Sequence, residues 1–147
     1  MDHKIELGVK GMWKDMDVIF NEIVEQNEAI KNLKETLAEK KSNDIQAKTG
    51  LGRMVKKALD DKKEKQAEEI VGKLRRTAYD YKLNETAGDE MFMNSAFLVD
   101  KGREKEFDII MDDLGDKYKD RIKFMYAGPL PVFNFVNIVI YPEEWEK

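Results

Sequence analysis

The fold is decided by residues 91–126, which read MFMNSAFLVDKGREKEFDIIMDDLGDKYKDRIKFMY. Residues 91–99 are apolar on both faces of an alternating pattern around Phe97, which predicts a strand in the centre of a sheet. Alternation returns at Ile122, Phe124 and Tyr126 and predicts a second strand. Between these strands, apolar residues recur at the spacing of one helix face, at Phe107, Ile110, Met111, Leu114 and Tyr118. The stretch is therefore predicted to form a strand, a helix and a strand.

The sequence before this stretch shows the same two periodicities. Ile5, Leu7 and Val9 alternate with Glu6, Gly8 and Lys10 before Trp13, which predicts an opening strand over Lys4–Trp13. From Asp15 the apolar residues follow one another at helical spacing, which predicts an amphipathic helix to about Lys40.

A second helix follows, and either Ser42 or Asn43 could cap its start. Its apolar positions continue from Met54 to Tyr81 and are interrupted by the charged run Asp60–Lys65. This run is either the solvated middle of one long helix or a turn between two helices. Residues 84–89 are expected to form a loop.

Beyond Tyr126 the chain continues into Gly128-Pro129-Leu130-Pro131. Glycine permits unusual backbone angles and the prolines restrict φ and lack a backbone donor, so the strand is expected to end here in a stiff connector. Residues 133–140 are a further β-prone run. The order of elements predicts a single α+β domain, with a small antiparallel or mixed sheet of three to four strands packed against amphipathic helices.

Composition excludes several classes of protein. A chain of 147 residues with 41% hydrophobic residues supports one core, and the net charge of −4 disfavours binding to nucleic acid. The absence of cysteine excludes a disulfide framework and a thiolate nucleophile, and it fits a reducing, cytoplasmic location. Since no stretch approaches the roughly 20 apolar residues of a membrane span, no contact with a membrane is expected.

The residues that could carry chemistry are few. His3 is the only histidine and lies at the terminus, where it is a poor candidate for a base or a ligand. Asp108, Asp112 and Asp116 recur on one side of a predicted helix, which is typical of a solvated face, and Gly50 and Gly52 lack the remaining residues of a phosphate loop. We therefore predict no enzymatic activity, catalytic residue, metal, cofactor or small-molecule substrate. The alternative is a small ligand- or metal-binding domain that uses these aspartates or glycines.

Three parts of the chain resemble the gas vesicle protein L/F family. Asn94–Asp100, followed by the helix that carries Phe107, is similar to the family's Asn-x-Ala-Phe-Leu-Val strand and its helix. Phe124–Pro131 is similar to a strand that leads into the family's Gly-Pro-x-Pro-Pro-Tyr-x-Phe signature, although Val132, Phe133 and Asn134 replace Pro-Tyr-Ser. The opening strand and Gly52–Leu59 resemble the family's first strand and a later helix.

The resemblance implies an accessory protein of gas vesicles, the hollow protein shells that give some microbes buoyancy. Its expected partners are the main gas vesicle shell protein and other accessory proteins, either as an assembly factor or as a minor component of the shell. Family members usually carry another α/β domain first, so the resemblance is to their C-terminal domain.

The stretch from Gly128 to Phe135, which combines prolines with phenylalanine rings, is the candidate protein contact. From the residues alone, its rings could pack into the core or form a surface for another protein, and core packing is favoured. The predicted contact residues are Gly128, Pro129, Leu130, Pro131, Phe133 and Phe135.

Overall fold

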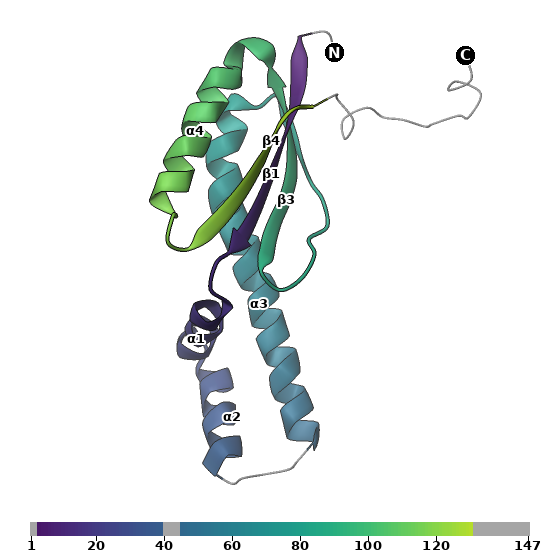
Figure 1. The fold of residues 1–147 in the computed structure, drawn as a ribbon. Coiled ribbons are helices and arrows are strands. Elements are labelled where there is room, and N and C mark those ends of the chain that lie inside the picture. Colours follow the sequence, from purple (N-terminus) through teal and green to yellow (C-terminus); the bar gives the residue numbers. More distant parts are fainter. Residues whose placement is uncertain (1–2, 40–44, 131–147) are drawn as a thin grey trace, which may run out of the picture.

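The structure is a computed structural model that describes residues 3–39 and 45–130. It contains a sheet of four antiparallel strands in the order β2–β3–β1–β4 (Figure 1). The strands are β1 (Lys4–Trp13), β2 (Asp80–Leu83), β3 (Met91–Asp100) and β4 (Ile122–Leu130). The predicted α+β class, the opening strand and the central position of β3 are confirmed.

Two strand–helix–strand units interleave to build this sheet. Helices α1 (Met16–Gln26), α2 (Glu28–Glu39) and α3 (Ile45–Leu74) lie between β1 and β2, and α4 (Glu104–Lys117) lies between β3 and β4. Each unit joins strands that run in the same direction and leaves room between them for a strand of the other unit. This is the βαββαβ topology of ferredoxin-like folds.

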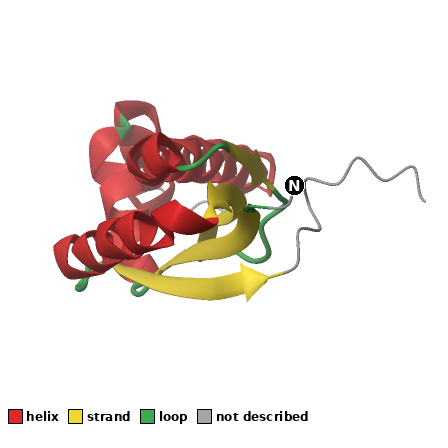
Figure 2. Ribbon diagram, turned by 90° about the horizontal axis from the view of Figure 1, so that it is seen from above, coloured by secondary structure: helices red, strands yellow, loops and turns green. Residues whose placement is uncertain are grey.

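Helices cover one face of the sheet (Figure 2). On that face Ile5, Leu7 and Val9 of β1 are buried beside Phe97 and Val99 of β3. The C-terminal half of α3 and the apolar side of α4 complete the core with Ile70, Leu74, Phe107, Met111 and Leu114. The alternation of Ile5, Leu7 and Val9 with Glu6 and Gly8 is thus explained by a sheet with one face on the core.

The remaining helices form an arm beyond the end of the sheet. Figure 1 shows α1, α2 and the N-terminal half of α3 extending past the strands. Ile30 of α2 is completely buried in this arm, where Leu51, Met54 and Val55 of α3 are half-buried. α3 is about 45 Å long at 1.5 Å per residue, so one helix belongs to both the arm and the core.

The structure corrects the predicted helix over residues 15–40, which is two helices. Asn27 interrupts it with an extended backbone, at φ −126° and ψ 102°. Its side-chain oxygen accepts a hydrogen bond from the Ile30 N–H at 3.1 Å, so Asn27 ends α1 and caps α2. Helical periodicity continues across the break, and this is why the sequence pattern did not reveal it.

The second predicted helix needs two corrections. The charged run at residues 60–65 is the middle of one continuous helix, which resolves the alternative, but α3 ends at Leu74 rather than near Tyr81. Residues 80–83 instead form β2, which the sequence analysis missed. All four side chains of β2 are exposed, so it lacks the alternating burial that identifies a strand.

The end of the last strand also differs from the prediction. β4 continues through Gly128 and Pro129 to Leu130, whereas a connector was expected from Gly128. Ala127 lies opposite Gly8 and Leu130 opposite Glu6, so two residues of β4 face Leu7 alone. A β-bulge of this kind accommodates glycine and proline within an edge strand. Ser42, Asn43 and the β-prone run at residues 133–140 lie outside the described residues.

A polar network connects the arm to the body of the protein. The guanidinium of Arg121 donates two hydrogen bonds to the carboxylate of Glu22 on α1, at 2.7 and 2.8 Å. Lys62 on α3 pairs with the same carboxylate at 2.9 Å. The hydrogen bond from Arg121 has the largest effect on Glu22 and, with that from Lys62, lowers its pKa to about 2. The network therefore stabilises the position of the arm when Glu22 is ionised.

We expect Glu22→Gln to lower the free energy of unfolding near pH 7 by about 1–3 kcal/mol, which allows for the partial exposure of the pair. Because the folded protein depresses the pKa of Glu22, this contribution is present above the unfolded-state pKa near 4.5 and disappears as the pH falls through about 2. The difference between wild type and Glu22→Gln should therefore shrink between pH 5 and pH 2 in urea titrations, in the window set by these two values.

Glu25→Gln is the matched control, because Glu25 pairs with Lys31 on the surface and its side chain is 69% exposed. It should leave stability nearly unchanged across the same pH range. An equal loss in both variants would show that the Glu22–Arg121 pair has no special role.

Candidate protein-contact surfaces

The predicted contact stretch is only partly described by the structure. Gly128 and Pro129 are exposed in the bulge of edge strand β4, and Leu130 is the last residue of that strand. Pro131, Phe133 and Phe135 lie outside the described residues, so the choice between core packing and a contact surface for their rings stays open.

Two residues just before Gly128 add apolar surface to this edge. The Met125 side chain is 47% exposed and the Tyr126 side chain is 39% exposed. The Tyr126 ring packs on Phe107 with 5.8 Å between centroids, and its hydroxyl donates a hydrogen bond to Asp108 at 2.5 Å. Partial burial is the main cause that raises the pKa of Tyr126, and the hydrogen bond to the Asp108 carboxylate is the second. Tyr126 is therefore a neutral, oriented ring on the surface.

A groove on the sheet face opposite the helices is continuous with this edge. We call it the outer groove; its volume is about 540 Å³. Small residues from three strands, Gly8, Ala96 and Ala127, line it together with Met125 and the polar Asn94. Because Gly8, Ala96 and Ala127 have small side chains or none, another protein can approach the backbone of the sheet closely in this groove.

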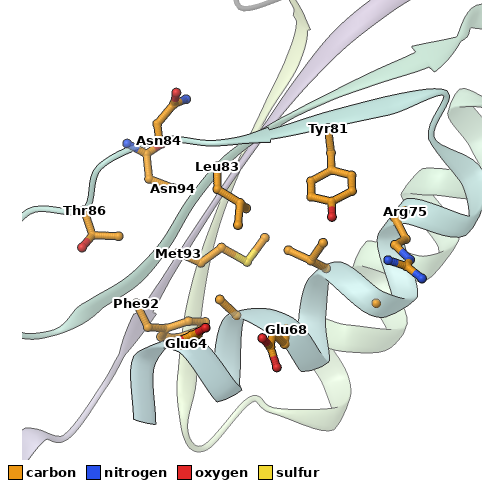
Figure 3. Close-up of a pocket in the computed structure, with 13 residues that line it drawn as sticks. Glu64, Glu68, Arg75, Tyr81, Leu83, Asn84, Thr86, Phe92, Met93 and Asn94 are labelled. Atoms are coloured by element: carbon orange, nitrogen blue, oxygen red, sulfur yellow. The ribbon is translucent and has the colours of Figure 1, made fainter. Parts of the chain in front are cut away.

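A second groove, the α3/β2 groove, runs between the C-terminal half of α3 and strand β2 (Figure 3). Its volume is about 630 Å³. Tyr81 and Leu83 extend from β2 toward α3, and Phe92 and Met93 form the apolar base between them. β2 lies at the edge of the sheet, and Leu83 on its helix-facing side remains 55% exposed.

This groove was not predicted, because Tyr81 falls within the predicted second helix. The available signal was the alternation of Asp80 and Lys82 with Tyr81 and Leu83, which is typical of a strand. This stretch is too short for alternation alone to establish a strand against the helical pattern before it.

The candidate chemical residues do not form a site within residues 3–39 and 45–130. No group of three or more acidic or histidine side chains converges there on a position for a metal ion. Asp108 instead accepts the hydrogen bond of Tyr126, while Asp112 and Asp116 are exposed. Gly50 and Gly52 lie inside α3 rather than in a loop.

None of the helices in the described part of the chain combines the length and apolar character needed to cross a membrane. Even α3, with 30 residues, has charged side chains along its whole length.

The fold is similar to two crystal structures of gas vesicle protein GvpF. The chain superposes on the protein from Anabaena sp. PCC7120 with a TM-score of 0.80 at 20% identity, covering 92% of this chain and 55% of that one. For the protein from Microcystis aeruginosa the TM-score is 0.75 at 18% identity, with the same coverage. These values establish a shared fold.

Two proteins that are similar in sequence are also gas vesicle proteins. Gas vesicle protein F1 of Halobacterium salinarum is 33% identical over 106 residues, which are 69% of this chain and 48% of the relative. Gas vesicle protein F of Haloferax mediterranei is 33% identical over 57 residues, which are 39% of this chain and 27% of the relative. The chain thus spans about half the length of the Halobacterium salinarum relative and of the two solved structures, and 27% of the Haloferax mediterranei relative.

The fold, a ferredoxin-like domain with a helical arm, is therefore the fold of the two GvpF crystal structures. The family described as gas vesicle synthesis protein GvpL/GvpF matches residues 1–137, and the chain belongs to this family. The family resemblance predicted from the sequence is confirmed.

Proposed function

We propose that this protein is an accessory factor that binds the main gas vesicle shell protein and other accessory proteins while gas vesicles form. Membership of the GvpL/GvpF family carries the proposal. In the cell we place it in the cytoplasm and on gas vesicles, and we propose that it has no enzymatic activity. We also propose that the chain corresponds to the C-terminal domain of the family's longer members.

The contact that we propose combines the end of β4 with the outer groove. Met125, Gly128 and Pro129 are exposed along an edge strand, and the outer groove adjoins them with a floor of small residues. Exposed apolar surface beside a strand at the edge of a sheet favours association with another protein. Leu130, Pro131, Phe133 and Phe135 follow directly in the chain and extend the proposed contact.

A pull-down with the purified main shell protein tests the function. Wild-type protein should retain the shell protein, whereas the double substitution Phe133→Ala, Phe135→Ala should weaken binding at least about tenfold, because the proposed contact would lose two aromatic rings. Circular dichroism should show that the double variant remains folded.

Val18→Ala and Ile109→Ala serve as controls, because these exposed apolar side chains lie on helices α1 and α4 and neither lines the outer groove. Both should bind like wild type. No binding by wild type would refute the proposed function, while full binding by the folded double variant would refute only the assignment of the contact.

A further inference from the structure

We propose that the α3/β2 groove receives an amphipathic helix of a partner protein, running antiparallel to α3, with acidic residues in its first turn and basic residues in its last. The inference relies on the proposed function only for the origin of that helix, which is another gas vesicle protein. The groove lies at the opposite edge of the sheet from β4. It shares only Asn84 and Asn94 with the lining of the outer groove.

The lining of the groove provides apolar surface that is still exposed to water. The Leu83 side chain is 55% exposed and the Tyr81 side chain is 37% exposed, although both are on the strand face that elsewhere packs on helices. They extend above Phe92 and Met93, which are buried (Figure 3). An apolar side chain placed between them would be removed from water together with Leu83. This favours an occupant with an apolar face.

The edge of β2 favours a helix over an added strand. β2 has only four residues, and the carboxylate of Asp80 already accepts the Tyr81 N–H at 2.8 Å. Short strands and occupied donors are features that protect an edge from pairing with another strand. A helix needs no such pairing because its backbone hydrogen bonds are internal, and helix-in-groove binding uses only its apolar face.

The length of the groove defines how much helix it can hold. Glu64 and Arg75 line its two ends on the α3 side, and their separation along the helix is about 17 Å at 1.5 Å per residue. This corresponds to about three turns of a partner helix. Gly72 lies between them with open space where a side chain would be, so the partner backbone can approach α3 closely there.

Charges at the two ends determine the direction of the helix. Glu64 and Glu68 are exposed near one end and Arg75 is exposed at the other. Within residues 3–39 and 45–130, none of the three forms an ion pair or hydrogen bond through its side chain. A partner with a basic C-terminal turn near the glutamates and an acidic N-terminal turn near Arg75 complements these charges. A partner helix with these charges is also stabilised by its own dipole, which favours acidic residues at the N-terminus and basic residues at the C-terminus.

The test uses two designed peptides and the full chain. Each fluorescent peptide is about 15 residues long, long enough for three turns, and has leucine along one face. Peptide A has glutamates in its first turn and lysines in its last, and peptide B has these charges exchanged. Fluorescence polarisation should show that wild type binds peptide A more tightly than peptide B.

Leu83→Lys should weaken the binding of peptide A at least about tenfold, because it removes an apolar contact and adds a charge to the groove. Ile109→Lys is the matched control on α4, where Ile109 is 60% exposed, and should bind like wild type. The double substitution Glu64→Lys, Glu68→Lys should reverse the preference in favour of peptide B. Since all of these side chains are exposed, the variants should keep the melting temperature of wild type.

Failure of peptide A to bind, or equal binding by the Leu83→Lys variant, would overturn the inference. So would a wild-type dimer that Leu83→Lys dissociates, or a photo-crosslink from position 83 to residues 131–147 of the same chain, because each places a different occupant in the groove. Peptide binding without capture of the shell protein would refute only the proposed function. Capture of the shell protein without peptide binding would refute only the groove.

Discussion

Phe97→Ala should lower the free energy of unfolding by about 3–5 kcal/mol, the largest effect that we expect of any single substitution. Phe97 is completely buried in central strand β3. Its ring packs on Phe107 of α4 at 5.2 Å and on Tyr81 of β2 at 6.1 Å, measured between centroids. The substitution would leave a cavity where the sheet contacts the helix layer. Urea denaturation followed by circular dichroism measures the loss.

Two further substitutions test whether the loss of stability in Phe97→Ala comes from the cavity rather than from replacing any aromatic residue. Phe97→Leu keeps most of the volume and should lose about half as much stability or less. Tyr79→Ala removes an aromatic ring that is 71% exposed and should change the free energy of unfolding by less than about 1 kcal/mol. A loss in Phe97→Ala as small as that in Tyr79→Ala would contradict the central role of Phe97.

Gly128→Ala should lower the free energy of unfolding by about 2–4 kcal/mol, from backbone strain and steric overlap together. Gly128 has φ +146°, a conformation that residues with a side chain rarely adopt. A Cβ atom there would lie 2.5 Å from Cδ2 of Leu7 and 3.2 Å from the backbone oxygen of Glu6. Leu7 is 1% exposed, so it has little room to move away.

Gly115→Ala is the control for this prediction. Gly115 lies in α4, and a Cβ atom there would have nothing within 4 Å. Alanine should therefore stabilise the helix by about 0.5–1 kcal/mol. Thermal denaturation of both variants should show shifts of opposite sign. A neutral Gly128→Ala variant would show that the bulge in β4 does not depend on glycine.

Much of the fold could be predicted from the sequence because its long elements bury one continuous face. β1 places its apolar residues Ile5, Leu7 and Val9 at alternate positions, and α4 presents Phe107, Met111 and Leu114 at helical spacing. Apolar residues on both faces around Phe97 likewise predicted the central strand, and the structure buries Ala96, Phe97 and Leu98. In each case the pattern along the chain and the burial in the fold have the same physical cause.

The missed features depend on contacts between distant parts of the chain. β2 exists because its backbone pairs with β3, with Tyr81 opposite Phe97 and Leu83 opposite Ser95, and none of its side chains is buried. The break at Asn27 depends on one side-chain hydrogen bond, which does not change the periodicity. The Glu22–Arg121 pair joins residues 99 positions apart, so neither residue stood out in the sequence.

The candidate contacts divide in the same way. Proline and the large rings identified Gly128–Phe135 as a stretch of interest, and the structure describes its first residues as an exposed edge. The α3/β2 groove had no signal of this kind, because residues from α3, β2 and β3 form it together.

The sequence by itself determined the α+β class, the family, the opening strand and the central strand–helix–strand unit, since these follow from local periodicity and from motifs within single elements. Only the tertiary structure decided the order of the strands, the second edge at β2, the position of the helical arm and both grooves. Strand pairing and groove shape arise from contacts between residues far apart in the chain, and a pattern along one segment does not specify which distant segment it will contact.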